Sequence, residues 1–390
     1  MHLQTLLIVF LLSLAYGQDR QLISKLNPGC PNCDSSYTLV YTRAEGQDDT
    51  IHQIWDFTRG VPSVIYAVGT VNSTMTIAWN RREPENFTFT ESVKYSFAAA
   101  IDKLYEYEDC QDVGHIDDRC PRRALPLRDV GWALNASILT SDEVMITMHG
   151  FYKDRRRSGL IHMKLDLLPF TDYAVDLPRL IHTANSSLID ISLVNFTTSM
   201  NASRYAIHFL MVSTDNWNDV MNYTMRKSLD DEHTPGVFEI IEVKTPKSRT
   251  SGAGGFMQFR PVGYTEQERS VSSSTNAYIS PITRKPLPNN MTTLGRFYKD
   301  YEPVELLAQQ MFISFGLPGD GYYKQRNFTS WSFTFGYGSP PVESVSLFVI
   351  IIISIGLGVP VLLALSGVTF VLVRRYRQRR NLPERFIDDE

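Results

Sequence analysis

The 390-residue sequence has few cysteines and no large excess of charge of either sign. It contains four Cys, and its formal net charge at pH 7 is −4. No broad basic field is available for nucleic acid, so a nucleic-acid partner is excluded. Hydrophobic residues make up 43% of the chain and aromatic residues 12%, which is typical of a packed globular protein and not of a disordered stalk.

The sequence also lacks the common catalytic and metal-binding motifs. It has eight His, but none stands in an HExxH pattern or beside a pair of CxxC motifs. No GxSxG elbow, phosphate-binding loop or dinucleotide-binding glycine pattern follows a predicted strand. We therefore expect no catalytic residue, no metal and no cofactor. A lumenal hydrolase stays open as an alternative, because sequence cannot show a pair of carboxylates in a cleft.

One long apolar stretch organises the chain. Residues 347–373 carry no charge, and the basic run RRYRQRR follows at residues 374–380. This length exceeds what a helix needs to cross a membrane, and basic residues beside a span stay cytoplasmic. The apolar run at residues 6–14 ends in Ala15-Tyr16-Gly17, as in a cleaved secretory signal. The sequence thus predicts a signal peptide (1–17), a lumenal region (18–344), a transmembrane helix (345–373) and a cytoplasmic tail (374–390).

Alternation of apolar and polar residues dominates the lumenal region. It is clearest at residues 93–97, 161–167, 189–193 and 331–335, and it is typical of strands with one face on a core. The sequence predicts an all-β, sandwich-like region of two packed β subdomains, with a soft boundary near 168–178. Residues 303–312 are the best candidate for a short helix, and residues 267–290 are expected to form an exposed loop.

The four cysteines are Cys30, Cys33, Cys110 and Cys120. In an oxidising lumen their even number suggests two disulfides. A Cys110–Cys120 bridge is favoured because it closes a short loop, although Cys30 or Cys33 could instead reach across to it. Cys30 and Cys33 form a CxxC motif, but it lies in a loop rich in Pro and Gly, and no second CxxC exists. A structural role is therefore favoured over redox chemistry.

Acceptor sites for N-linked glycans are unusually dense. Nine Asn-x-Ser/Thr sequences precede the apolar stretch, more than chance predicts. Glycans at this density would cover backbone that proteases otherwise reach. The acceptors are Asn72, Asn86, Asn135, Asn185, Asn195, Asn201, Asn222, Asn290 and Asn327.

Several blocks resemble the glycosylated lysosomal membrane protein family. They are residues 54–79 (IWDFTRGVPSVIYAVGTVNSTMTIAW), 179–184, 229–235 with 237–238, 255–264, 315–322 and 330–342. The likeness runs in order from about residue 39 to the apolar stretch. It implies a non-enzymatic accessory subunit in the lysosomal membrane, partnered with a major-facilitator transporter that exports dipeptides. The subunit would stabilise the transporter and shield it from proteolysis. The sequence departs from the family at Tyr376, which Arg377-Gln378-Arg379 follows where a tyrosine-based sorting signal needs a bulky apolar residue.

Contact with the transporter is expected at two places. Small residues at Ser354 and Gly358, with Gly356 nearby, would let a second helix approach the span closely. The loops that carry Gly316 and Tyr322, and Pro340 and Pro341, are expected to hang nearest the lipid bilayer. A cell-surface receptor or adhesion module is the other alternative to an accessory subunit.

Overall fold

The computed structural model describes residues 20–154, 157–177, 179–214, 219–228, 238–249, 251–270, 272–286, 292–343 and 347–380. These residues fall into two units, a β body that ends at Val342 and a C-terminal unit from Glu343 onward, which we describe separately. The predicted signal peptide, the acceptor Asn290 and the tail beyond residue 380 lie outside the described residues.

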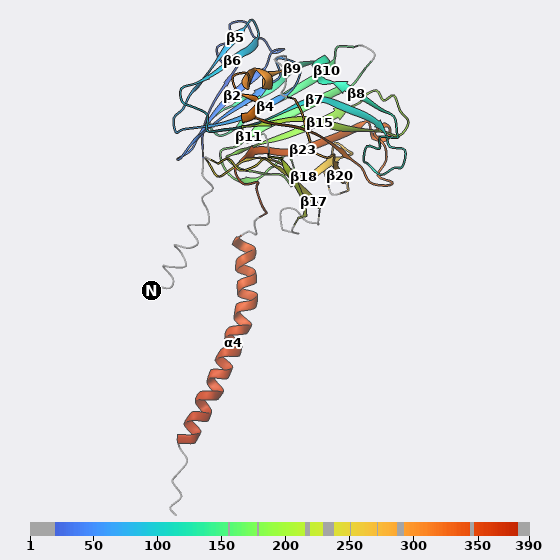
Figure 1. The fold of residues 1–390 in the computed structure, drawn as a ribbon. Helices are drawn as coiled ribbons and strands as arrows, with labels where there is room; N and C mark the ends of the chain where they lie inside the picture. Colours follow the sequence, from blue (N-terminus) through green and yellow to red (C-terminus); the bar gives the residue numbers. More distant parts are fainter. Residues whose placement is uncertain are drawn as a thin grey trace, which may run out of the picture. The chain divides into compact units, whose positions relative to one another are not determined.

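Two large antiparallel sheets build the body (Figure 1). In the first sheet the order of the strands is β1 (Gln21–Leu26), β2 (Leu39–Glu45), β3 (Thr50–Asp56), β4 (Ser63–Gly69), β7 (Tyr95–Glu108), β15 (Ser203–Ser213), β22 (Leu307–Phe315) and β20 (Ala277–Ile279). Two short strands extend it, since β8 (Arg122–Pro126) pairs with β7 and β21 (Thr283–Arg284) pairs with β22.

The second sheet faces the first. Its order is β16 (Asn222–Lys227), β17 (Glu239–Lys244), β18 (Gly255–Tyr264), β23 (Phe328–Tyr337), β14 (Ser186–Val194), β11 (Leu160–Leu167), β10 (Val144–Tyr152) and β9 (Val130–Leu139). The short β19 (Ser274–Thr275) pairs with β18. The strands β11 and β14, on either side of residues 168–178, are direct neighbours, so the chain before and after this segment shares one sheet. The expected β-sandwich is confirmed.

Smaller elements complete the body. They are two hairpins, β5 (Met75–Asn80) with β6 (Glu83–Phe89) and β12 (Asp172–Tyr173) with β13 (Ile181–His182), the helices α2 (Thr293–Phe297) and α3 (Tyr323–Arg326), and the 3₁₀ turns Leu127–Asp129 and Pro303–Glu305. The prediction of a helix at residues 303–312 is wrong, because only the first turn of this segment is helical and β22 follows it. The period of two from Leu307 to Phe315, with alternate side chains buried, outweighs the short helical start. The loop expected at 267–290 likewise contains β19, β20 and β21.

The main core lies between the sheets and is rich in aromatic rings. Phe97 on β7 stacks on Phe335 of β23 with the ring centroids 4.5 Å apart. Phe315 on β22 meets Trp331 of β23 edge-on at 5.4 Å. Such contacts from both sheets join nearly all inward-facing side chains into one buried cluster, which supplies most of the apolar burial that stabilises the fold.

A second core covers part of the outer face of the first sheet. The hairpin β5–β6 and helix α2 pack there, and Phe87 and Phe89 contact Phe297 with centroids 5.4 and 6.1 Å apart. This cover lies over β2, β3, β4, the first half of β7 and the second half of β15, which contributes Leu210 and Val212. The second half of β7, the first half of β15, most of β22 and β20 form the remainder of this face.

Both disulfides are local. Cys110 pairs with Cys120, as expected, and Cys30 pairs with Cys33. The alternative in which Cys30 or Cys33 reaches Cys110 or Cys120 is therefore wrong. The bridge at Cys110–Cys120 closes the loop between β7 and β8, which borders the open part of the first sheet.

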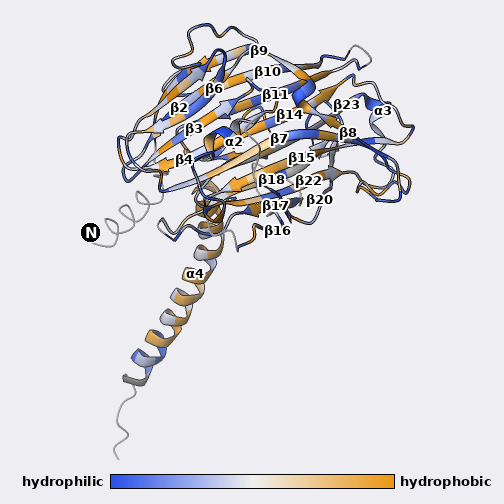
Figure 2. Cartoon of the chain, turned by 45° about the horizontal axis from the view of Figure 1, so that its top comes forward, coloured by the Kyte–Doolittle hydropathy of each residue, from blue (hydrophilic) through white to orange (hydrophobic). Residues whose placement is uncertain are grey.

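The C-terminal unit is the helix α4 (Leu347–Arg380), which has the length and composition to cross a membrane. Its apolar stretch appears in hydrophobic colours in Figure 2. Pro360 lies inside it and removes one backbone hydrogen bond, which a helix in a membrane tolerates.

Candidate functional site

A groove of about 600 Å³ opens on the remainder of the outer face of the first sheet. We call it the sheet groove. Its floor is formed by β7, β15 and β22, and its walls by residues 115–122 and 278–285. This volume lies within the range of ligand-binding pockets. Strand register determines which side chains meet there, because residues directly opposite each other on neighbouring strands share a face.

One row of paired residues crosses the floor from Lys103 through His208 to Phe312. A β-bulge precedes it, since Ile101 pairs with Phe209 and Lys103 with His208, which leaves Asp102 as an extra residue. Bulges of this kind redirect side chains. Asp102 Oδ1 lies 2.5 Å from Nδ1 of the buried His208, so the imidazole lines the groove in an orientation fixed by a carboxylate.

The next row sets the length of the groove. It runs from Tyr105 through Ala206 and Ser314 to Tyr278. Neighbouring strands are about 4.8 Å apart, so the backbones of the two Tyr stand about 14 Å apart. Ala206 and Ser314 are buried beneath this row, and the Tyr105 ring lies 5.9 Å from the rings of His208 and Phe312. The groove therefore has an aromatic residue at each end.

Cationic side chains line the groove. Lys103 Nζ lies 5.6 Å from the centre of the Tyr105 ring, and the Arg122 guanidinium lies 5.9 Å from it. Lys285 lines the opposite wall. Lys103 also pairs with Asp102 at 3.6 Å, and Arg122 pairs with the exposed Asp118 at 2.9 Å. With both carboxylates counted, these five groups contribute a net charge of one positive unit, and the imidazoles of His115 and His208 also line the site.

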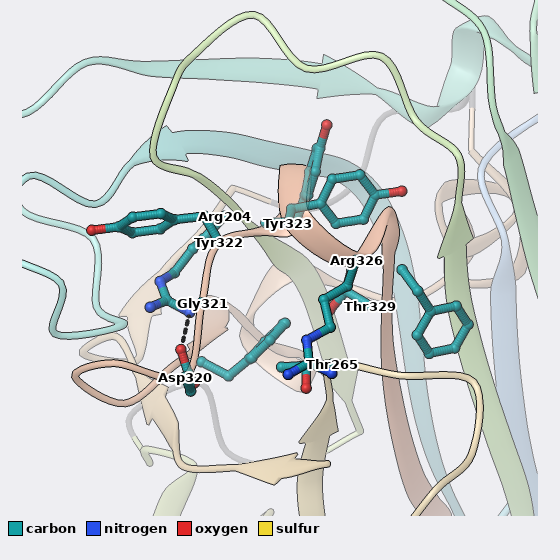
Figure 3. A pocket seen from close by; sticks show the side chains of 11 residues that line it. Arg204, Thr265, Asp320, Gly321, Tyr322, Tyr323, Arg326 and Thr329 are labelled. Atoms are coloured by element: carbon teal, nitrogen blue, oxygen red, sulfur yellow. Dashed lines mark ion pairs between the residues drawn. The ribbon is translucent and has the colours of Figure 1, made fainter.

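One wall is held by a buried cluster of charges that we call the Arg204 clamp (Figure 3). The Arg204 side chain is only 2% exposed and forms ion pairs with Asp109, Asp112 and Asp320 at 2.7, 2.7 and 2.8 Å. Burial alone would lower the pKa of Arg204, but the carboxylates of Asp320 and Asp112 raise it above its ordinary value. The guanidinium is therefore a permanent charge at the centre of three loops.

The clamp fixes the loop that walls the groove. Asp109 accepts hydrogen bonds from the backbone N–H groups of Val113 and Gly114, and Asp112 accepts one from Gly319. A Cβ on Gly114, whose φ is +79°, would lie 2.4 Å from the carbonyl oxygen of Gly316. The two backbones can meet only because both residues are glycine. The loop thus presents the ring of His115 edge-on to Tyr278, with centroids 5.7 Å apart.

Figure 3 also shows a second cavity, beside the clamp, with Tyr322, Tyr323 and Arg326 in its lining. Its volume is about 20 Å³, which suits a single water molecule and not a ligand. The sheet groove is therefore the candidate binding site.

The structure separates the two loops that were expected to contact a partner. Gly316 and Tyr322 belong to the Arg204 clamp, and the Tyr322 ring lies 5.1 Å from the guanidinium. Pro340 and Pro341 follow β23, whose ten residues span about 33 Å, so they lie at its far end. There the Pro341 carbonyl accepts a hydrogen bond from buried Gln258.

The predicted glycan acceptors lie at the surface. Asn86 and Asn185 are half-buried, while Asn72, Asn135, Asn195, Asn201, Asn222 and Asn327 are exposed. Asn135 lies on β9 and Asn222 on β16, the two edge strands of the second sheet. A glycan there would block strand pairing with another chain. Asn185 accepts a hydrogen bond from Arg20 through Oδ1, an arrangement that leaves Nδ2 for the sugar.

Sequence reasoning missed the sheet groove and the Arg204 clamp entirely. The groove residues lie far apart in the chain, and only strand register brings them together. The one feature of the sequence that could have indicated the clamp is the pair of glycines that it requires, Gly114 and Gly316. Of these, only Gly316 was named as a candidate, as a possible contact with a partner.

The fold and the anchor together define a membrane protein with one candidate span among its described residues and a large β-sandwich body that precedes it. The family model described as glycosylated lysosomal membrane protein matches residues 38–378. The chain belongs to this family, and it is a lysosomal membrane glycoprotein. It is 27% identical to glycosylated lysosomal membrane protein A of Xenopus laevis, over 93% of this chain and 92% of the relative. It is also 27% identical to the Danio rerio protein (91% and 89% covered) and 25% identical to the Homo sapiens protein (88% and 86% covered).

Proposed function

We propose that the protein is a non-enzymatic accessory subunit that binds a lysosomal major-facilitator transporter, stabilises it and protects it from proteolysis. The family resemblance supplies the class of partner, a transporter of dipeptides. The observation that carries the proposal is a strip of small residues on α4. Ser354 and Gly358 share one face of this helix, with Gly356 nearby, and small residues in a span allow a second helix to approach closely.

The body supports a protective role. Its acceptor asparagines lie on both edges of the second sheet and on loops, so glycans would cover the segments that proteases attack first. The glycosylated body would then shield the lumenal loops of the transporter to which it is bound.

Crosslinking followed by copurification from lysosomal membranes tests the proposal. The full-length protein is expected to enrich one polytopic transporter over an unrelated single-span lysosomal glycoprotein. Loss of the protein is expected to shorten the lifetime of that transporter. Enrichment of no polytopic protein, or an unchanged lifetime, would contradict the proposal.

A matched pair of variants then locates the contact. Gly358→Leu adds a large side chain to the face that Ser354 shares, because four residues are about 40° apart on a helix. Gly367→Leu adds the same side chain nine residues further on, about 180° around the helix. We expect Gly358→Leu to reduce copurification and Gly367→Leu to leave it unchanged. Equal recovery of both variants would move the contact to the body.

A further inference from the structure

We propose that the sheet groove is a binding site for an acidic, extended peptide segment of a partner protein. The occupant supplies carboxylates to Lys103, Arg122 and Lys285 and places an apolar or aromatic side chain between Tyr105 and Tyr278. The site lies wholly within the β body. The inference therefore stands whether or not α4 binds a transporter.

The charge of the lining selects an anion. The three cations come from separate segments, Lys103 from β7, Arg122 from β8 and Lys285 from the residue after β21. Lys285 is hydrogen-bonded through its N–H to the carbonyl of Ala308, which fixes this segment along β22. The cations therefore lie on opposite walls and do not converge on one point. A single small anion could reach only some of them, whereas an extended segment with several carboxylates can reach all three.

The shape of the lining selects a peptide. The groove reaches from Tyr105 on β7 to Tyr278 on β20, three strand spacings or about 14 Å, which is the length of about four extended residues. Tyr105, Tyr278 and Phe312 provide apolar contact area, and Gln310 and Thr283 provide hydrogen-bonding groups. A neutral glycan would match the aromatic rings but would leave the net positive charge of the lining uncompensated.

The groove is preorganised and accessible. The Arg204 clamp and the Cys110–Cys120 bridge hold the wall that carries His115, so little ordering is needed on binding. None of the nine acceptor asparagines lies in the lining segments 103–122, 278–285 and 310–314. No predicted glycan is therefore attached to the lining itself.

The test uses the full-length glycosylated protein in detergent and a fluorescein-labelled peptide that carries four Glu around one Phe. A peptide with Gln in place of each Glu is the matched probe. We expect fluorescence polarisation to show binding of the Glu peptide, and about tenfold weaker binding of the Gln peptide. Raising the NaCl concentration from about 0.1 M to about 1 M should strongly weaken the binding of the Glu peptide, because salt screens the charges at the mouth of the groove.

Charge reversal locates the site. The double variant Arg122→Glu with Lys285→Glu should bind the Glu peptide at least tenfold more weakly than the wild type. Lys25→Glu with Lys299→Glu is the control, because both residues are exposed and it changes the net charge equally, while Lys25 lies on β1 at the opposite edge of the first sheet. We expect the control to bind within about twofold of the wild type. An unchanged thermal midpoint of both variants shows that the body has kept its fold.

Three outcomes would overturn the proposal. They are equal binding of the Glu and Gln peptides, equal loss of binding in the groove and control variants, and direct binding of sialyllactose or inorganic phosphate to the groove without any binding of the Glu peptide. The third outcome would assign the groove to a carbohydrate or a phosphate group. None of these results changes the copurification of a transporter through α4, so the two proposals can fail separately.

Discussion

Replacing Arg204 by Met should destabilise the body strongly, because it leaves a buried carboxylate without its counter-charge. The side chains of Arg204 and Asp109 are 2% and 1% exposed, and their Nε and Oδ2 atoms are 2.7 Å apart. The side chains of Asp112 and Asp320 are more exposed, at 32% and 17%, so water can partly solvate their charges when the guanidinium is removed. The expected cost is therefore that of one broken buried pair, about 3–5 kcal/mol.

Thermal unfolding of the full chain measures this cost. At about 2 °C for each kcal/mol, the midpoint should fall by about 6–10 °C. Arg204→Lys keeps the charge but loses the planar guanidinium that reaches three carboxylates. Its midpoint should therefore lie between those of the wild type and Arg204→Met. Asp109→Asn combined with Arg204→Met removes both charges of the most buried pair, and the double variant should be less destabilised than the sum of the single ones.

Two results would contradict this role of Arg204: a midpoint of Arg204→Met within about 2 °C of the wild type, or simple additivity of its effect and that of Asp109→Asn. Either result would mean that the clamp is hydrated or that the loops hold their positions without it. The clamp would then give no reason for a rigid wall of the sheet groove.

Three further predictions concern the acid tolerance and the core of the body. Burial raises the pKa of Asp166 from 3.8 to about 6. Ionisation of Asp166 therefore destabilises the folded body, and this cost grows from about pH 4 and is complete above about pH 6. Asp166→Asn should raise the thermal midpoint at neutral pH, and the gain should vanish by about pH 4. Burial lowers the pKa of His52 from 6.5 to about 4, so stability is lost as the pH falls through this window; His52→Gln should lessen that loss in a pH series of melting curves. Phe335→Ala removes a buried ring that stacks on Phe97, and its free energy of unfolding in urea should fall by about 3–5 kcal/mol.

The sequence was sufficient to predict the β-sandwich, because its signal is local. In β11, Ile161, Met163 and Leu165 face the core while His162 and Lys164 point outward, as the alternation indicated. The same rule corrects the short helix predicted at residues 303–312. Leu307, Gln309 and Met311 are buried at a period of two, although Gln309 is polar and obscured that pattern in the sequence.

The sheet groove could not be predicted in this way, because it depends on contacts between distant residues. Lys103 and Phe312 are brought into one row only by their pairing with His208, and a bulge at Asp102 sets the phase of that pairing. A shift of one residue would have turned every side chain of β7 beyond the bulge to the other face. No pattern within a single strand carries this information.

The distribution of the predicted glycans bears on where partners can approach the body. Asn135 and Asn222 lie on the edge strands of the second sheet, so glycans on them would close both routes by which another chain could extend that sheet. In the first sheet, the hairpin β5–β6, which carries Asn86, covers one part of the outer face, and the sheet groove occupies another. A protein ligand would therefore meet the predicted glycans at the edges of one sheet and a cationic, aromatic opening on the other. This asymmetry favours recognition through side chains in the groove over strand addition, and it explains why charge reversal there, and not disruption of an edge strand, is the decisive experiment.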